Sequence, residues 1–147
     1  MKIAGTNSVP LTKDRAYQAL QDPLVLAQCM PGCEALEKIG EDEYSMKMKM
    51  VLAAVSGQFQ GKVRISDSNP PDSFRLIVEG TGKVGFMKGD GLLTLTEGEE
   101  GKTKVDFDGE VQVGGTIASV GQRLIDTTAK LVIKRFFDKL AATVAEA

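Results

Sequence analysis

The chain has 147 residues, of which 42% are hydrophobic and 26% charged, and its net charge is −2. This balance is typical of a folded globular protein and argues against intrinsic disorder. It also lacks the basic surplus that a general nucleic-acid-binding protein would carry. We therefore expect residues 1–147 to form one domain with a sizeable core.

The N-terminal part of the chain is predicted to contain one strand and two short helices. Residues 2–9 are expected to form a strand that Pro10 ends, and Thr12 is the expected N-cap of a helix running to about Gln21. Asp22-Pro23 begins a second helical piece, which ends in a turn rich in proline and glycine.

The middle of the chain alternates between apolar and polar residues, which predicts antiparallel strands with one apolar and one solvated face. Short turns separate these strands, so they are expected to pair in the order of the chain. The predicted strands are 36–39, 44–52, 59–65, 74–78, 91–96 and 103–113.

The C-terminal segment changes to a helical period after Gly114-Gly115. From Ile117 to Leu140, apolar residues recur at spacings of three and four. This pattern predicts one helix of nearly thirty residues that begins at Thr116.

This order of elements predicts an α+β, helix-grip fold, in which a curved seven-stranded antiparallel sheet surrounds the long C-terminal helix. The two short helices follow the first strand. Twisted strands curl and make one face concave, and the apolar stripe of the helix has to be buried against that face. The predicted concave positions carry no charged side chain, and the sheet is too broad for one helix to fill.

We therefore predict an apolar ligand-binding cavity between the sheet and the helix. Any one methionine fits an ordinary core, but a row of three beside two phenylalanines also fits the wall of a ligand site. The residues expected to line the cavity are Met46, Met48, Met50, Phe59, Phe74, Phe86, Phe107, Val120, Leu124 and Phe136.

One glycine motif could indicate dinucleotide binding and one acidic motif could indicate cation binding, but the neighbouring sequence favours neither. Residues 80–85 match the G-x-G-x-x-G pattern of dinucleotide-binding loops, but that pattern needs a helix directly after it. Another strand follows here, so a glycine-rich hairpin or bulge is the better interpretation. The carboxylates of Asp106, Asp108 and Glu110 could bind a cation, yet they fall on the solvated face of their strand.

Catalytic and metal sites are not expected in this sequence. Without histidine, no Ser–His or Cys–His pair can form. A structural zinc site needs about four Cys, His or carboxylate ligands, and the chain has one cysteine pair, Cys29 and Cys33, without a second pair or any histidine, so we expect reduced thiols. No catalytic residue, metal or cofactor is therefore predicted.

The expected location is the cytoplasm, because neither a signal peptide nor an apolar stretch of about 18 residues is apparent. Basic residues lie along one side of the last predicted helix, and such a side is most often simply exposed to solvent. The alternative is a weak attraction to an anionic membrane surface, which would make the protein peripheral on the cytoplasmic face. These residues are Arg123, Lys130, Lys134, Arg135 and Lys139.

Three groups of residues resemble a known family. Asp22-Pro23 with Leu26 and residues 29–33, Cys-Met-Pro-Gly-Cys, is similar to the pattern D-P-x-x-L-x-x-C-[ILM]-P-G-C. The other groups are residues 82–89, ending in Gly-Phe-Met-Lys-Gly, and the run from residue 112 to residue 125. The chain resembles the CoxG family of carbon monoxide dehydrogenase, within the START/Bet v 1-like, or SRPBCC, helix-grip superfamily.

The resemblance implies an accessory role for a molybdenum-containing CO dehydrogenase or a related molybdenum hydroxylase. It implies that the protein helps this enzyme meet the cytoplasmic membrane, with an isoprenoid quinone or lipid as apolar cargo. Two alternatives remain open: a polyketide cyclase-like helix-grip enzyme, and an assembly factor without a ligand. A cyclase would need titratable groups inside the fold to move protons, and the alternation places almost none there.

Overall fold

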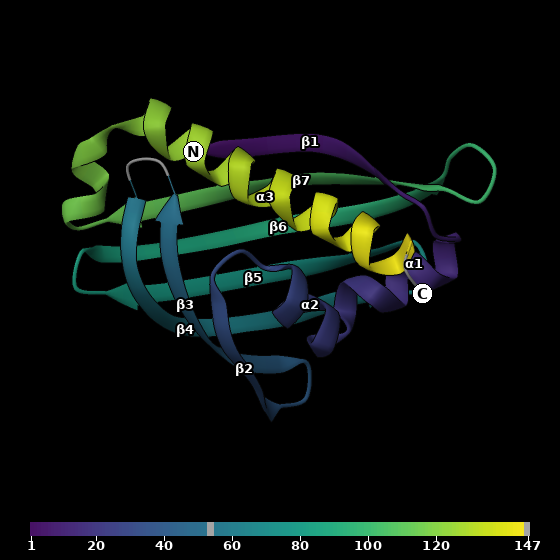
Figure 1. Ribbon diagram of the computed structural model, residues 1–147, viewed down its shortest axis with the longest axis horizontal. Helices are drawn as coiled ribbons and strands as arrows, with labels where there is room; N and C mark the ends of the chain where they lie inside the picture. The colour runs from purple at the N-terminus through teal and green to yellow at the C-terminus, as the bar shows by residue number, and fades with distance from the viewer. Residues whose placement is uncertain (53–54, 146–147) are drawn as a thin grey trace.

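A seven-stranded antiparallel sheet and a long C-terminal helix dominate the structure (Figure 1). The computed structural model describes residues 1–52 and 55–145, together with their side chains except those of residues 50–52, 55, 56 and 145. In chain order the elements are β1 (Lys2–Val9), α1 (Lys13–Gln21), α2 (Pro23–Cys29), β2 (Cys33–Gly40), β3 (Glu43–Leu52), β4 (Val55–Asn69), β5 (Ser73–Gly82), β6 (Gly85–Glu97), β7 (Thr103–Gly114), the 3₁₀ helix η1 (Thr116–Val120) and α3 (Gln122–Ala145).

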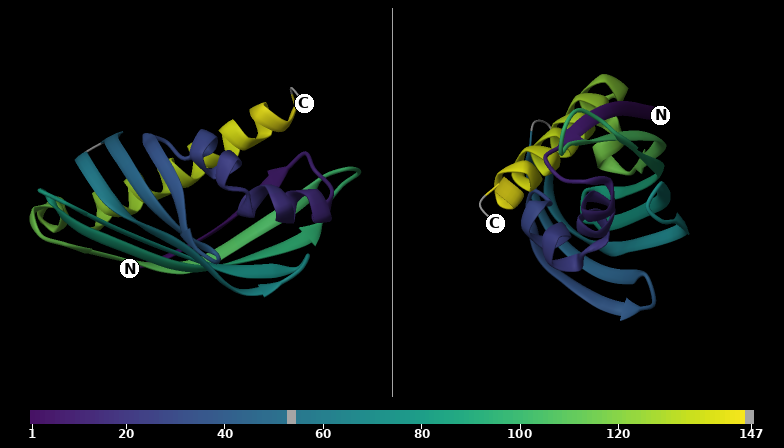
Figure 2. Two further views of the ribbon diagram at one scale, coloured as in Figure 1. Left: turned by 90° about the horizontal axis from the view of Figure 1, so that it is seen from below. Right: turned by 90° about the vertical axis from the view of Figure 1, so that its right-hand side faces the viewer.

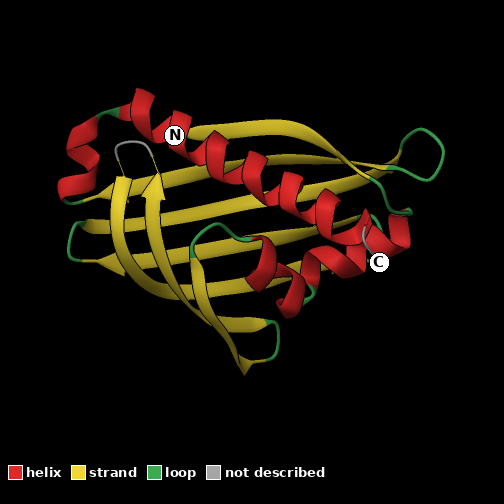
Figure 3. Cartoon of the chain, viewed as in Figure 1, coloured by secondary structure: helices red, strands yellow, loops and turns green. Residues whose placement is uncertain are grey.

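The sheet has the strand order β1-β7-β6-β5-β4-β3-β2, so the first strand pairs with the last. Every neighbouring pair is antiparallel. The sheet curves strongly, and α3 runs across its concave side (Figure 2). The helices α1 and α2 lie near the C-terminal end of α3 (Figure 3). The α+β architecture with a seven-stranded sheet and two short helices after the first strand is thus confirmed.

Local sequence explains how the two short helices begin. Thr12 is the N-cap residue of α1, as predicted, although its side chain makes no capping hydrogen bond. At the start of α2 the Oδ1 of Asp22 accepts a hydrogen bond from the backbone N–H of Leu24 at 2.9 Å. Pro23 follows at a position where its missing N–H costs nothing. The turn between α1 and α2 is therefore fixed by two adjacent residues.

The predicted strands are present, but three of them begin at least three residues earlier than predicted. β2 begins at Cys33, β4 at Val55 and β6 at Gly85, whereas strands were expected from residues 36, 59 and 91. The glycine-rich start of β6 pairs fully with β5, and Gly82 lies opposite Gly85 across a two-residue turn. The G-x-G-x-x-G motif is therefore a hairpin, as interpreted from the sequence.

The prediction of one continuous C-terminal helix is wrong at its start. Residues 116–120 form the separate η1 helix, and Gly121 has φ +93° before α3 begins. A positive φ of this kind ends a helix and suits glycine, which has no Cβ. The apolar spacing of three and four continues across the break, so periodicity alone does not reveal it.

The core lies between the concave face and the helices. Tyr17 of α1 packs edge-on against Phe74 of β5, with 5.5 Å between ring centroids, and its hydroxyl donates to the carbonyl of Ser73. Leu140, near the end of α3, is fully buried. Tyr17, Phe74 and Leu140 belong to one core cluster, which joins α1 and the last turns of α3 to the sheet.

Candidate functional site: an apolar cavity

A cavity of about 310 Å³ lies between the concave face of the sheet and α3. This volume is within the range of small-molecule sites. Strands β5, β6 and β7 supply most of its floor, α3 covers it, and α2 and η1 contribute one residue or more each. The apolar side chains on its wall include Leu26, Leu76, Val78, Met87, Leu93, Val111, Ile125 and Val132.

Glycines on the concave face create part of this space. Gly89 and Gly91 occupy successive inward positions of β6, and Gly109 of β7 lies opposite Gly91. At these positions the floor is bare backbone, since glycine has no side chain to place in the cavity. The hollow therefore follows directly from which residues the alternating pattern turns inward.

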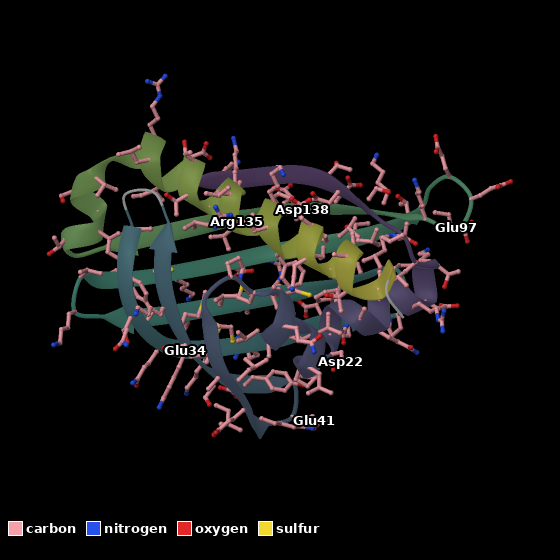
Figure 4. The ribbon with its side chains drawn as sticks, viewed as in Figure 1. Asp22, Glu34, Glu41, Glu97, Arg135 and Asp138 are labelled. Carbon is pink, nitrogen blue, oxygen red and sulfur yellow. The ribbon has the colours of Figure 1, made fainter. Side chains whose placement is uncertain are left out.

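Charged residues border the cavity without directing charge into it. Lys88 and Asp90 alternate with the inward glycines of β6, so their side chains project from the convex face. Asp90 accepts a hydrogen bond from Arg75 at 2.7 Å, and Lys88 lies 3.7 Å from Glu79. Asp108 and Glu110 of β7 follow the same alternation and are exposed, as are Arg135 and Asp138 of α3, which Figure 4 labels.

One hydroxyl is buried in the cavity wall. Thr128 of α3 is 4% exposed, and its Oγ1 donates a hydrogen bond to the carbonyl of Leu124 at 2.8 Å. Because this bond uses the only proton of the hydroxyl, Thr128 can still accept but not donate. Among the described residues of β3–β7 that line the cavity, those at inward positions include no Lys, Arg, Asp or Glu.

The structure brings four of the predicted cavity residues together on the wall, namely Met48, Phe74, Phe107 and Phe136. Met46 and Phe59 are buried in the adjoining core, at 5% and 4% exposure, without lining the cavity. Val120 ends η1, is half-buried and does not line the cavity either. The side chain of Met50 lies outside the described residues.

Two of the predicted residues face solvent, which corrects the prediction for them. Phe86 is 47% exposed and Leu124 is 42% exposed. Phe86 has the parity of Lys88 and Asp90 in β6, so its neighbour Met87 lines the cavity instead. Leu124 belongs to the first turn of α3 after the break at Gly121, where Ile125 faces the cavity.

The wall contains residues that the sequence pattern could have identified. Met87 and Gly89 continue the alternation of β6 backwards from Leu93, and Val111 and Val113 continue that of β7. Gly89 and Gly91 continue the inward positions of β6, but glycines are easily assigned to turns, so this part of the strand was not predicted. Which residues of α2 and α3 line the cavity depends on how these helices pack on the sheet, and hydrophobic periodicity alone does not determine that.

The two cysteines are free thiols, and burial affects both of them. Cys29 at the end of α2 is 2% exposed, and burial raises the pKa of its thiol, partly offset by a hydrogen bond from Thr143 and the charge of Lys139. Burial also raises the pKa of Cys33. A raised pKa keeps both thiols protonated near neutral pH, which opposes nucleophilic reactivity.

The acidic side chains and thiols of the described residues are too dispersed to form a metal centre. Within residues 1–52 and 55–145, no group of three or more Cys, Asp or Glu side chains is placed to hold a metal ion. In that same part of the chain, none of the helices combines the length and hydropathy of a membrane span.

The curved sheet, the helix across its concave face and the apolar cavity between them define a START/Bet v 1-like helix-grip protein. A START superfamily protein from Mycobacterium smegmatis superimposes with a TM-score of 0.79 at 10% identity, covering 99% of this chain and 97% of that one. Ara h 8.0201 superimposes with a TM-score of 0.69, also at 10% identity, over 100% of this chain and 99% of that one.

Within this fold the chain belongs to the CoxG family of carbon monoxide dehydrogenase subunits, whose model matches residues 5–145. A conserved protein from Geobacillus kaustophilus is 33% identical and has a TM-score of 0.95, with 99% of this chain and 96% of that one covered. No curated protein matches the sequence. The family resemblance and the fold expected from the sequence are thus confirmed.

Proposed function

We propose that this protein binds a neutral apolar molecule, an isoprenoid quinone or another lipid, in the cavity between the sheet and α3. It does so without catalysing a reaction and serves a molybdenum-containing CO dehydrogenase-type enzyme at the membrane. The observation that carries this proposal is the 310 Å³ cavity, whose wall is almost entirely apolar. Membership of the CoxG family supports the enzyme partner.

The energetics favour an alkyl or prenyl chain as the bound group. Each CH₂ that moves from water into an apolar site contributes about 0.8 kcal/mol. A chain of about ten carbons therefore reaches about micromolar affinity after the costs of ordering ligand and protein. A charged head group has to remain at the mouth, because an unpaired charge inside costs several kcal/mol.

Two alternatives have less support. A cyclase-like enzyme needs groups that transfer protons to and from its substrate. Thr128, with its proton already donated, is a poor candidate for that role. An assembly factor without a ligand would have its interior filled by side chains, and the cavity argues against that arrangement.

The distribution of charge supports a contact with an anionic membrane at one end of the molecule. The β5–β6 turn, η1 and the start of α3 lie together there, and the N–H of Ile117 bonds the carbonyl of Val84 (Figure 1). Segments 80–89 and 111–125 contain no carboxylate side chain. They carry the exposed Lys83 and Arg123 beside the exposed apolar Phe86 and Leu124.

The first test is to purify the protein from cells and identify its bound molecules by native mass spectrometry. Wild type is expected to retain quinone or lipid, and Met48→Lys is expected to lose it, because Met48 lines the cavity at 6% exposure. Ser45→Lys is the matched control, since it adds the same charge to the opposite face of β3.

A second variant covers the case in which Met48→Lys fails to fold. Val132→Phe fills the cavity from α3 without adding charge and is expected to lower retention in a protein with native circular dichroism. Normal retention by both variants would contradict the assignment of the cavity as the binding site. Turnover of a substrate by the isolated protein would contradict the non-catalytic role.

A further inference from the structure

Gly89 occupies a position where the sheet has room for a side chain. In the register of the sheet it lies between Val78 of β5 and Val111 of β7, and the valines and the glycine all line the cavity. The row across the three strands thus reads valine, glycine, valine. The gap in this row opens into the cavity, because no Cβ projects from the floor there.

Backbone geometry does not require glycine at this position. A Cβ built on Gly89 meets no atom within 4 Å in the described part of the chain apart from its sequence neighbours, and its φ lies outside the left-handed region. Other glycines of the sheet differ. A Cβ on Gly61 would lie 1.6 Å from the carbonyl oxygen of Glu79, and one on Gly109 would lie 2.5 Å from that of Asp90.

Glycine inside a strand weakens it, through the entropy lost on folding and the absence of a side chain to pack. At Gly61 and Gly109 the close approach of two backbones explains the choice. At Gly89 the fold supplies no such reason, and the consequence that remains is the free volume above it. That volume belongs to the cavity.

We infer that Gly89 is a specificity-determining residue that sets the depth of the cavity and so the length of apolar chain that it accepts. This inference rests on the proposed ligand-binding function. A side chain at position 89 fills the space above the bare floor. Ligands short enough to avoid that space bind normally, and longer ones lose the contacts that their terminal carbons make.

The test uses a graded series of neutral ligands, the 1-alkanols from 1-octanol to 1-tetradecanol. Their affinities are measured by displacement of the fluorescent apolar probe N-phenyl-1-naphthylamine. For wild type, each added methylene is expected to raise affinity about fourfold until the cavity is full, the equivalent of about 0.8 kcal/mol per CH₂. In Gly89→Val the rise is expected to stop at a shorter alkanol, and in Gly89→Leu at a shorter one still.

Gly98→Val is the matched control, because a Cβ at Gly98 makes only ordinary contacts of 3.6 Å or more in the exposed β6–β7 loop. It is expected to keep the wild-type cut-off. If Gly89→Val and Gly89→Leu keep the same cut-off as wild type, the inference about Gly89 is overturned while ligand binding stands. If wild type binds neither the probe nor any alkanol, the proposed function fails and the inference fails with it.

Discussion

Two inward glycines of the sheet illustrate how the same residue type meets opposite requirements. Gly61 of β4 lies opposite Gly80 of β5, and the strands approach so closely there that any side chain would meet backbone. Gly89 of β6 has open space above it. At the first position glycine allows the sheet to form, and at the second it leaves the cavity open.

Alanine substitutions at these two glycines are predicted to change stability in opposite directions. Gly89→Ala is expected to raise the free energy of unfolding by about 0.4–1 kcal/mol, because the unfolded chain loses conformational freedom and the folded state has room. Gly61→Ala is expected to lower it by at least about 1–3 kcal/mol through the clash with Glu79.

Urea unfolding followed by circular dichroism measures both changes on one scale. A destabilised Gly89→Ala protein would show that the position is more crowded than the structure indicates. A stabilised Gly89→Ala protein with weaker ligand binding would instead be a case of stability opposed to function.

At the level of single residues, the sequence predicted the apolar character of the cavity better than it predicted which residues line it. The alternation correctly placed Met48, Phe74 and Phe107 on the concave face. It failed at Phe86 because the glycines around it suggested a turn, and the parity of a strand cannot be counted through a turn. An aromatic residue was therefore preferred over its neighbour Met87, which the continuing strand turns inward.

Among the elements, α3 covers the cavity along more than half of its length and is fully packed only nearer its end. Its residues from Ile125 to Phe137 include those that line the cavity, while Leu140, closer to the C-terminus, is completely buried. Ion pairs at spacing four, such as Lys130 with Asp126, lie on its exposed side and add little to stability. The turn of α3 that contains Leu140 therefore anchors the helix beside the cavity.

Truncating side chains at the two ends of α3 is predicted to have very different costs. Leu140→Ala is expected to lower the free energy of unfolding by about 2–5 kcal/mol, because it leaves a void in a fully packed region. Leu124→Ala, at a side chain that is 42% exposed, is expected to change it by no more than about 0.5 kcal/mol. Thermal and urea unfolding of both variants check this, and equal losses would contradict the difference in packing.

The elements themselves were largely predictable, and their boundaries less so. Binary alternation and turn residues gave the strands because a half-buried antiparallel strand has a strict period of two. The break between η1 and α3 escaped because a lone glycine is often tolerated inside a helix, and only its backbone angle shows that the helix ends. The covering of the cavity by α2 is a tertiary arrangement that no local pattern encodes.

Considered as a whole, the molecule has ends of different chemistry. The end formed by the β5–β6 turn and the start of α3 has exposed apolar and basic side chains. The opposite end, with the β4–β5 and β6–β7 connections, exposes Glu97, Glu99 and Glu100 beside Lys102, and Asp72 there pairs with Lys13. An anionic surface would therefore attract the first end and repel the second, which orients the protein before any contact forms.

This asymmetry predicts how the protein binds vesicles. Binding to phosphatidylcholine vesicles is expected to strengthen when phosphatidylserine is added and to weaken with salt. Lys83→Glu and Arg123→Glu are each expected to weaken it by at least about fivefold, because each removes a basic residue that contributes about 1 kcal/mol near the surface and adds a carboxylate that the surface repels. Lys102→Glu, the same charge change in the exposed β6–β7 loop, is the control. Equal effects of all three substitutions in a sedimentation assay would contradict an oriented contact.

The hydroxyl of Thr128 has a consequence for acidic molecules that enter the cavity. Its proton is held by the carbonyl of Leu124, so a carboxylate that entered the cavity would find no donor on that side chain. A free fatty acid would have to keep its ionised end in water or take up a proton, and its own pKa would rise with burial. Neutral prenyl and alkyl molecules do not carry the cost of burying an ionised carboxylate. An apolar wall would therefore discriminate against acids of any chain length.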